Sequence, residues 1–180
     1  MARLIVFDLD GTLVDSSRDI AAAVDAALAL VAPGTPPIPV ETILSFVGEG
    51  ARLLVERCLA HAGLAAGADE VLPVYLDCYR ERLLDSTRFY PGVEEALDAL
   101  RGATLAVLTN KPGDMSRTIL DGLGATGRFA RVWGAGDVPA RKPDPAGLVA
   151  LLAELGRDAA DAWMVGDSAT AVEAVSTAKP

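Results

Sequence analysis

Four short segments place polar side chains at or shortly after the ends of apolar runs in which the sequence predicts strands. They are Asp8-Leu9-Asp10-Gly11-Thr12, Thr109-Asn110-Lys111, Arg141-Lys142 and Gly166-Asp167-Ser168. Because ligands in open α/β sheets bind beyond the carboxyl ends of the strands, we expect the four segments to meet in one place. Together they supply three carboxylates, hydroxyl groups, an amide and lysines. This set suits phosphoryl transfer, since an inert phosphate ester needs a nucleophile, cations on its oxygens and an acid for the leaving group.

The two acids of the first segment have other interpretations. Asp8 and Asp10 could be turn-forming residues, but two acids so close together at the end of a buried strand repel each other unless a cation is present. An EF-hand loop that begins at Asp8 is excluded, because its sixth position would be Leu13 instead of glycine and its twelfth would be Asp19 instead of glutamate. The pair therefore favours a site that binds a cation.

The remaining segments also have purely structural alternatives. Thr109 and Asp167 could be helix N-caps and nothing more. Lys142 is harder to explain in this way, because a cation near a helix N-terminus opposes the helix dipole, and a bound anion would remove that conflict. Lysine is also scarce, since only three of the sixteen lysines and arginines are lysines: Lys111, Lys142 and Lys179. The presence of a lysine, and not an arginine, at positions 111 and 142 therefore calls for a functional or structural explanation.

Three further features are weaker candidates. The segments "GEG" (48–50) and "GAG" (134–136) lack the third glycine of a dinucleotide-binding fingerprint. His61 is the only histidine of the chain. It lies late in a helical pattern, and a surface or packing role is expected for it.

The elements that must position the polar segments alternate between strand and helix in the second half of the chain. Strands are predicted at 4–10, 105–109, 131–134 and 162–165, and helices over 93–100, 114–122 and 148–155. Between residues 16 and 88 only helical patterns occur, one of them opened by Ser16 and Asp19 in the manner of a capping box. We expect a parallel sheet with right-handed crossovers. One α/β domain (1–15 and 89–180) would then carry a helical insertion (16–88).

Composition limits the class of protein and its partners. The net charge of -9 and the absence of a basic stripe argue against nucleic acid as a partner. No apolar run reaches the roughly 18 residues of a membrane-spanning helix, and the acids near the N-terminus argue against a signal peptide. Cys58 and Cys78 fall in helical patterns and are expected to be reduced. We expect a cytoplasmic protein, a monomer or a homodimer, with no membrane partner.

The motifs "FDLDGTLVDS", "LTNK", "RKPDP" and "VGDS", in this order and spacing, resemble those of the haloacid dehalogenase (HAD) superfamily. Within it, segments such as "VGEGARLLVERCL" and "FYPGVEEALDALR" are similar to those of phosphoglycolate phosphatases. The resemblance covers the whole chain. It implies a Rossmann-like HAD core with an inserted helical cap that closes over the site. It also implies a phosphatase that hydrolyses a small phosphate monoester, with 2-phosphoglycolate as the best single guess.

The resemblance assigns catalytic and metal-binding roles by motif. Asp8 would be the nucleophile that forms an aspartyl-phosphate, and Asp10 the general acid and base. Mg2+ would be held by the side chains of Asp8 and Asp167 and by the backbone carbonyl of Asp10. Thr109 and Lys142 would bind the phosphoryl oxygens.

The resemblance also implies substrate-binding residues. Asn110 would assist with the phosphate through its backbone or its amide. Gly11 and Thr12 belong to the first motif, and for this reason the resemblance assigns them to substrate binding. Gly48 and Gly50 resemble a loop whose backbone amides approach a substrate carboxylate, although glycines that only make a loop flexible are an equal alternative.

The chain departs from the family pattern in two places. The last motif usually ends in a second acid, where this chain has Ala171, and Glu173 would point roughly 200° away around a helix. The chain also ends at Pro180, before a further strand and helix that the pattern leads one to expect, so we expect an exposed sheet edge. These departures leave two alternatives to an active phosphatase. One is an impaired relative that binds phosphate or a partner, and the other is a phosphomutase or pyrophosphatase on the same fold.

Overall fold

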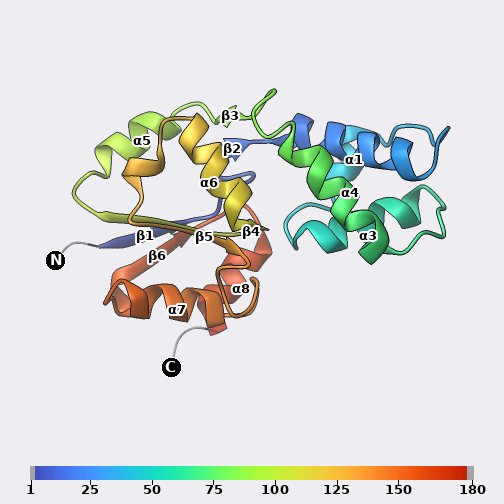
Figure 1. The fold of residues 1–180 in the computed structure, drawn as a ribbon. Helices are drawn as coiled ribbons and strands as arrows, with labels where there is room; N and C mark the ends of the chain where they lie inside the picture. Colours follow the sequence, from blue (N-terminus) through green and yellow to red (C-terminus); the bar gives the residue numbers. More distant parts are fainter. Residues whose placement is uncertain (1–2, 178–180) are drawn as a thin grey trace. The chain divides into compact units, whose positions relative to one another are not determined.

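The computed structural model describes residues 3–177, apart from the side chains of residues 172 and 175–177, and it divides into two compact units (Figure 1). The first comprises Met1–Asp15 and Arg88–Pro180, and the second comprises Ser16–Thr87. Arg88 belongs to the first unit because it pairs with Asp15. Lys179 and the predicted end of the fold at Pro180 lie outside the described residues.

The first unit is built on a parallel sheet. Its strands are β1 (Leu4–Phe7), β4 (Thr104–Pro112), β5 (Arg131–Ala135) and β6 (Ala162–Val165), in the order β5-β4-β1-β6. The central strand β1 places Phe7 opposite Val107 on one side and opposite Val165 on the other. All the pairings in this sheet are parallel, so the predicted α/β class is confirmed.

Helices cover both faces of this sheet (Figure 1). One face carries α5 (Val93–Ala99) and α6 (Gly113–Gly122), and the other carries α7 (Ala146–Glu154) and α8 (Ala169–Thr177). Two 3₁₀ helices, Thr126–Arg128 and Ala159–Asp161, precede β5 and β6. This three-layer arrangement is the expected result of right-handed crossovers between parallel strands.

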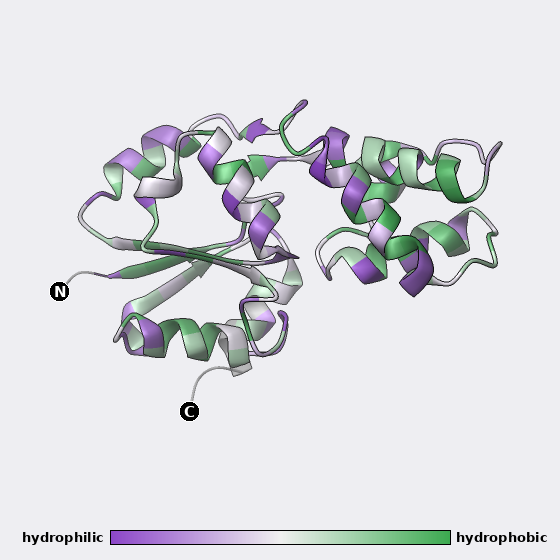
Figure 2. Cartoon of the chain, viewed as in Figure 1, coloured by the Kyte–Doolittle hydropathy of each residue, from purple (hydrophilic) through white to green (hydrophobic). Residues whose placement is uncertain are grey.

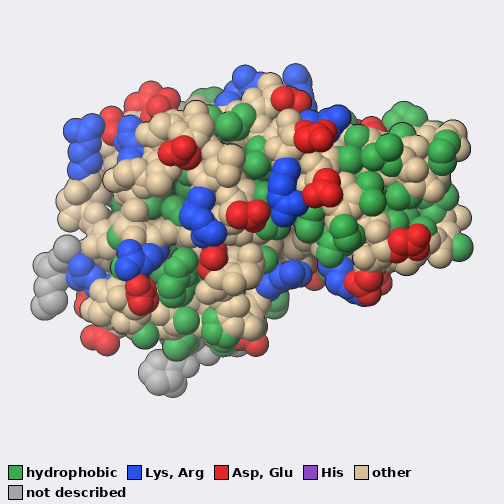
Figure 3. Space-filling model, viewed as in Figure 1, with side chains coloured by type: hydrophobic (Ala, Val, Ile, Leu, Met, Phe, Trp, Pro, Cys, Tyr) green, Lys and Arg blue, Asp and Glu red, His purple; other side chains and the backbone are tan. Residues whose placement is uncertain are grey.

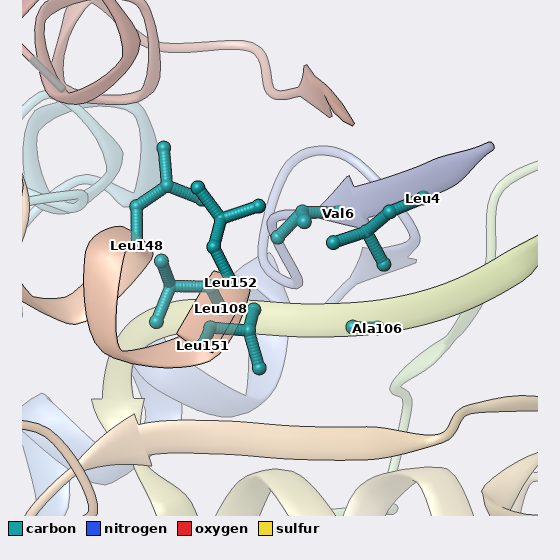
Figure 4. Close-up of a cluster of buried hydrophobic side chains, with 7 residues drawn as sticks. All are labelled: Leu4, Val6, Ala106, Leu108, Leu148, Leu151 and Leu152. Carbon is teal, nitrogen blue, oxygen red and sulfur yellow. The ribbon is translucent and has the colours of Figure 1, made fainter. Parts of the chain in front are cut away.

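The hydrophobic core beneath the site joins β1, β4 and α7 (Figure 4). Apolar residues run along β1 and α7 (Figure 2). Each fully buried leucine of this kind stabilises the fold by about 1.5–3 kcal/mol, so the ends of β1 and β4 are held firmly. The cluster consists of Leu4, Val6, Ala106, Leu108, Leu148, Leu151 and Leu152.

The ends of two strands differ from their predicted positions. The first strand ends at Phe7 and not at residue 10, because the backbone turns at Leu9, whose carbonyl accepts from the Leu13 N–H at 2.9 Å. Conversely, β4 continues to Pro112 and includes Thr109, Asn110 and Lys111. Asn110 and Lys111, which were expected after this strand, are therefore part of it.

Two short strands were missed by the prediction. The two-residue strands β2 (Val14–Asp15) and β3 (Arg88–Phe89) pair antiparallel where the chain leaves and re-enters the first unit. Strands of two residues are too short to show an alternating pattern.

The second unit is helical. It contains α1 (Ser17–Val31), α2 (Val40–Leu44), α3 (Ala51–His61) and α4 (Ala68–Arg80), with α4 packed against both α1 and α3. The five-residue helix α2 was not predicted, because it is too short to show a helical period. No helix of the described residues is long and apolar enough to cross a membrane.

Surface charges of both signs are interspersed on the face shown in Figure 3. Several form exposed ion pairs, such as Arg131 Nη2 with Glu154 Oε1 at 2.7 Å and Arg52 Nε with Asp69 Oδ1 at 2.8 Å. Exposed pairs of this kind contribute about 0–1 kcal/mol each, so they do little to hold the fold.

The predicted capping box at the start of α1 is wrong. Ser16 makes no capping hydrogen bond to the helix. The Asp19 carboxylate is buried and accepts hydrogen bonds from the backbone N–H groups of Ser86 and Thr87, at 2.9 and 2.8 Å, and from both of their hydroxyl groups. Because a buried carboxylate needs several donors, these long-range partners replace the local cap. Asp19 thus ties α1 to the segment that leads into β3.

We predict that Asp19→Asn lowers the free energy of unfolding at pH 7 by about 1.5–3 kcal/mol, the usual worth of hydrogen bonds to a charged group. Burial tends to raise the pKa of Asp19, but its hydrogen bonds to Ser86 and Thr87 outweigh burial and hold the pKa below 3.8. A lowered folded pKa gives stability that is complete above 3.8 and is lost as the pH falls through the folded pKa. Urea unfolding at several pH values measures the effect.

The matched control is Asp77→Asn, since Asp77 is an exposed acid in the same unit and pairs only across one helical turn with Arg80. Its effect should stay within about 0.5 kcal/mol. Equal stability of wild type and Asp19→Asn at pH 7 would contradict the prediction.

Candidate active site

Polar residues gather where β1, β4 and β6 end side by side. Asp8 follows β1 directly, and its N–H donates to the Val165 carbonyl of β6 at 2.8 Å. Asp167 follows β6 after Gly166, and Thr109 lies in the last part of β4. The parallel register therefore brings together segments that are more than a hundred residues apart in the sequence.

Asp8 forms a buried ion pair with Lys142. Lys142 Nζ lies 2.7 Å from Asp8 Oδ2, and the two side chains are 2% and 10% exposed. Although this ammonium is close to the carboxylate, it makes no hydrogen bond of acceptable geometry within the described residues. A buried ammonium with unsatisfied donors is costly, so the site is suited to an anion beside Asp8.

Asp10 forms a second ion pair, which is partly buried, with the buried Lys111. Lys111 Nζ lies 2.8 Å from Asp10 Oδ1 and 2.9 Å from Oδ2. Lys111 had no assigned role in the sequence-based prediction, although the scarcity of lysine was a signal that pointed to it. The two acids of the first motif therefore have separate cationic partners.

Asn110 holds the backbone of Lys142. Its Nδ2 donates to the Lys142 carbonyl at 2.8 Å, and its Oδ1 accepts from the Lys142 N–H at 2.9 Å. All four of these groups are buried. The side-chain amide is thus engaged with the chain itself, which makes Asn110 a positioning residue for Lys142.

Gly11 and Thr12 lie against Asp167. The Thr12 hydroxyl accepts from the Asp167 N–H at 3.2 Å, and its oxygen lies 3.4 Å from Asp167 Oδ1. Gly11 has a φ of +77°, and a Cβ at this position would lie 2.1 Å from Asp167 Oδ2. Only glycine permits this close approach, so both residues set the position of the Asp167 carboxylate.

The other predicted site residues have different surroundings. Thr109 is buried within β4, and its hydroxyl accepts from the Lys111 N–H at 3.3 Å, so it is not a helix N-cap. Gly48 and Gly50 lie in the helical unit with φ values of +121° and +98°, and their role in binding a substrate carboxylate stays a prediction. His61 is exposed and pairs with the ring of Phe46 in the same unit, in agreement with the surface or packing role that was predicted.

Ala171 occupies the place where the family pattern has a second acid. It is buried in α8, and its Cβ lies 2.5 Å from where a Cβ on Gly166 would be. The chain after β6 therefore passes so close to α8 that Gly166 can carry no side chain. Glu173 is exposed on the same helix.

The donors expected for a metal ion are two carboxylates and one carbonyl. No group of three or more His, Cys, Asp or Glu side chains suited to a metal occurs in residues 3–177, as far as their side chains are described. The Asp10 carboxylate is engaged with Lys111, and the family resemblance assigns the backbone carbonyl of Asp10 to the metal. The space left by the missing Cβ of Gly11 brings Asp167 against the peptide that carries this carbonyl. Oxygen donors alone fit a hard divalent cation such as Mg2+.

Residues 2–178 match the family model of haloacid dehalogenase-like hydrolases. The chain belongs to this family. The predicted superfamily is confirmed, and so is the prediction of an enzyme of the phosphoric monoester hydrolase class.

Relatives of this haloacid dehalogenase-like hydrolase include two curated proteins named phosphoglycolate phosphatase. The protein of Pseudomonas putida is 39% identical over 99% of the chain and 67% of its own length. That of Caulobacter vibrioides is 40% identical over 91% of the chain and 70% of its own length.

Solved structures are similar as well. A predicted phosphoglycolate phosphatase from Haemophilus somnus has a TM-score of 0.90 and 33% identity, and the match covers 98% of this chain and 82% of that one. A haloacid dehalogenase-like hydrolase from Bacteroides fragilis has a TM-score of 0.83 at 22% identity, covering 99% of this chain and 84% of that one. This second likeness shows the shared fold.

We predict that Asn110→Leu weakens the binding of inorganic phosphate by about 10–100-fold, because Lys142 loses the partner that fixes its backbone. Titration calorimetry with phosphate measures the affinity. Thr104→Val is the control, since it removes a bond of 3.1 Å from Arg157 at the opposite end of β4. The control should leave phosphate affinity unchanged, and an equal loss in both variants would show a general effect on the strand.

Proposed function

We propose that this hydrolase releases phosphate from a small phosphate monoester, with 2-phosphoglycolate as the first candidate, through an aspartyl-phosphate on Asp8. The observation that carries the proposal is the buried Lys142 ammonium beside the Asp8 carboxylate, with its hydrogen-bond donors unsatisfied. A phosphoryl group next to Asp8 would give these donors acceptors. The names of the relatives support phosphoglycolate as the substrate.

In the first step an oxygen of Asp8 forms a bond to phosphorus. The bond between phosphorus and the ester oxygen breaks, and its electron pair stays on that oxygen. Lys142 neutralises charge on the phosphoryl oxygens, and the buried Thr109 hydroxyl offers a donor there. The short turn at Leu9, which fixes Asp8 Oδ1 through a bond of 2.8 Å, keeps the nucleophile in place.

Asp10 moves the proton. It gives its proton to the ester oxygen as the alcohol leaves, and it then takes a proton from a water molecule. That water attacks phosphorus, and the bond to the Asp8 oxygen breaks. The products are the alcohol and inorganic phosphate, and both aspartates return to their starting state.

Magnesium would be held by the side chains of Asp8 and Asp167 with the Asp10 carbonyl, and when bound it supplies positive charge to the phosphoryl oxygens. The chain itself prepares this place by holding the Asp167 carboxylate between Thr12 and Gly11. Because the chain has a net charge of -9, localised cations are needed before an anionic ester can bind. The helical unit is proposed to act as the cap that selects the leaving group.

We expect phosphate release from 2-phosphoglycolate that depends on Mg2+ and stops with a chelator. Asp8→Asn should reduce kcat by more than about 1,000-fold, because removing a nucleophile typically costs this much or more. Asp121→Asn, at an exposed acid of α6, is the matched control and should leave kcat unchanged. A malachite-green assay measures the released phosphate.

A panel of hexose phosphates and pyrophosphate tests the substrate class in the same assay. Faster turnover of one of these would replace phosphoglycolate as the substrate. Turnover that survives Asp8→Asn would contradict the aspartyl-phosphate. Binding of phosphate without turnover of any ester would indicate the impaired relative, an alternative that the comparisons do not support.

A further inference from the structure

Lys111 is a buried cation whose position is set by β4 and whose charge is directed at Asp10. Its side chain is 4% exposed, and that of Asp10 is 16% exposed. The ammonium lies within 2.9 Å of both carboxylate oxygens, so the contact constrains the direction in which the Asp10 carboxylate points.

We propose that Lys111 is a positioning residue, which holds the Asp10 carboxylate in the direction from which it serves the ester oxygen. This inference rests on the proposed function of Asp10. Asp10 lies beyond the end of β1, in a turn that continues through Gly11 with its φ of +77°. A strand residue is a firmer support than a turn, and small displacements of a catalytic group lower rates strongly.

Stability alone does not explain the pair. A buried ion pair loses about as much hydration free energy as it gains from attraction, so replacing it with apolar residues is often neutral. The site also contains a second pair, Asp8 with Lys142, that separates the two acids. With Lys111 on Asp10, Lys142 remains available for Asp8 and for the phosphoryl group. The two lysines therefore have separate roles, with Lys111 on Asp10 and Lys142 on Asp8.

The test compares two esters that differ in their need for an acid. The leaving group of 2-phosphoglycolate is an alkoxide, which needs a proton, whereas p-nitrophenyl phosphate releases a stable phenolate without one. In Lys111→Met, the ratio of kcat for 2-phosphoglycolate to kcat for p-nitrophenyl phosphate should fall by about 10–100-fold. KM should change little. The ratio of the two kcat values does not depend on the fraction of folded protein. If Lys111→Met does not fold, Lys111→Gln, which keeps a hydrogen-bond donor, replaces it.

The double variant Lys111→Met with Asp10→Asn should show the ratio of Asp10→Asn alone, because both changes disable the same group. Arg101→Met is the matched control: it removes one positive charge, but Arg101 is exposed and pairs with Asp98 on the surface. Its ratio should equal that of the wild type. Equal losses on both esters in Lys111→Met, or losses that add in the double variant, would overturn the proposal.

A crystal structure of Lys111→Met gives a readout that needs no turnover. We expect the Asp10 carboxylate to leave its wild-type direction, and an unmoved carboxylate would overturn the positioning role. If the proposed function is wrong, the wild-type protein releases phosphate from neither ester. This result differs from every outcome that would overturn the role of Lys111 alone.

Discussion

Two carboxylates at the end of a buried strand need two cations, and the rest of the site follows from this requirement. Asp8 and Asp10 are two residues apart and lie where β1 leaves the core, so their charges repel each other with little screening by water. Each has its own lysine, with Lys142 Nζ 2.7 Å from Asp8 and Lys111 Nζ 2.8 Å from Asp10. The separate pairing compensates the charge of each carboxylate where β1 leaves the core.

The parallel sheet supplies these cations from distant parts of the sequence. The strand β4 lies beside β1 and extends to Pro112, and this extension places Lys111 next to Asp10. Lys142 lies in the segment between β5 and α7, and Asn110 of β4 holds its backbone at 2.8 and 2.9 Å. On the other side of β1, Thr12 holds Asp167 after β6. Hydrogen bonds from residues that need not touch a substrate, such as Asn110 and Thr12, therefore position the groups proposed to bind it.

The two ends of the helical unit lie side by side, because one carboxylate of this unit binds both. Asp19 in α1 accepts hydrogen bonds from Ser86 and Thr87, the residues at which the chain leaves this unit. Ser86 and Thr87 are 67 and 68 positions away from Asp19 in the sequence, so one carboxylate ties two distant chain segments together. The antiparallel pair of β2 and β3 continues this connection in the first unit.

Sequence patterns determined the fold class, the strands that carry the site and most of the residues that gather there, because buried parallel strands appear as apolar runs and polar residues follow them. Tertiary structure alone decided the partners. Asp19 has the position of a local capping residue in the sequence, but its carboxylate accepts hydrogen bonds from Ser86 and Thr87. Lys111 has no partner that the sequence predicts, and the pairing of β4 with β1 places it next to Asp10. Local periodicity reports which face of an element is buried. A charged side chain is satisfied by whatever donor or cation the packing brings within about 3 Å, and that depends on the register of strands far apart in the chain.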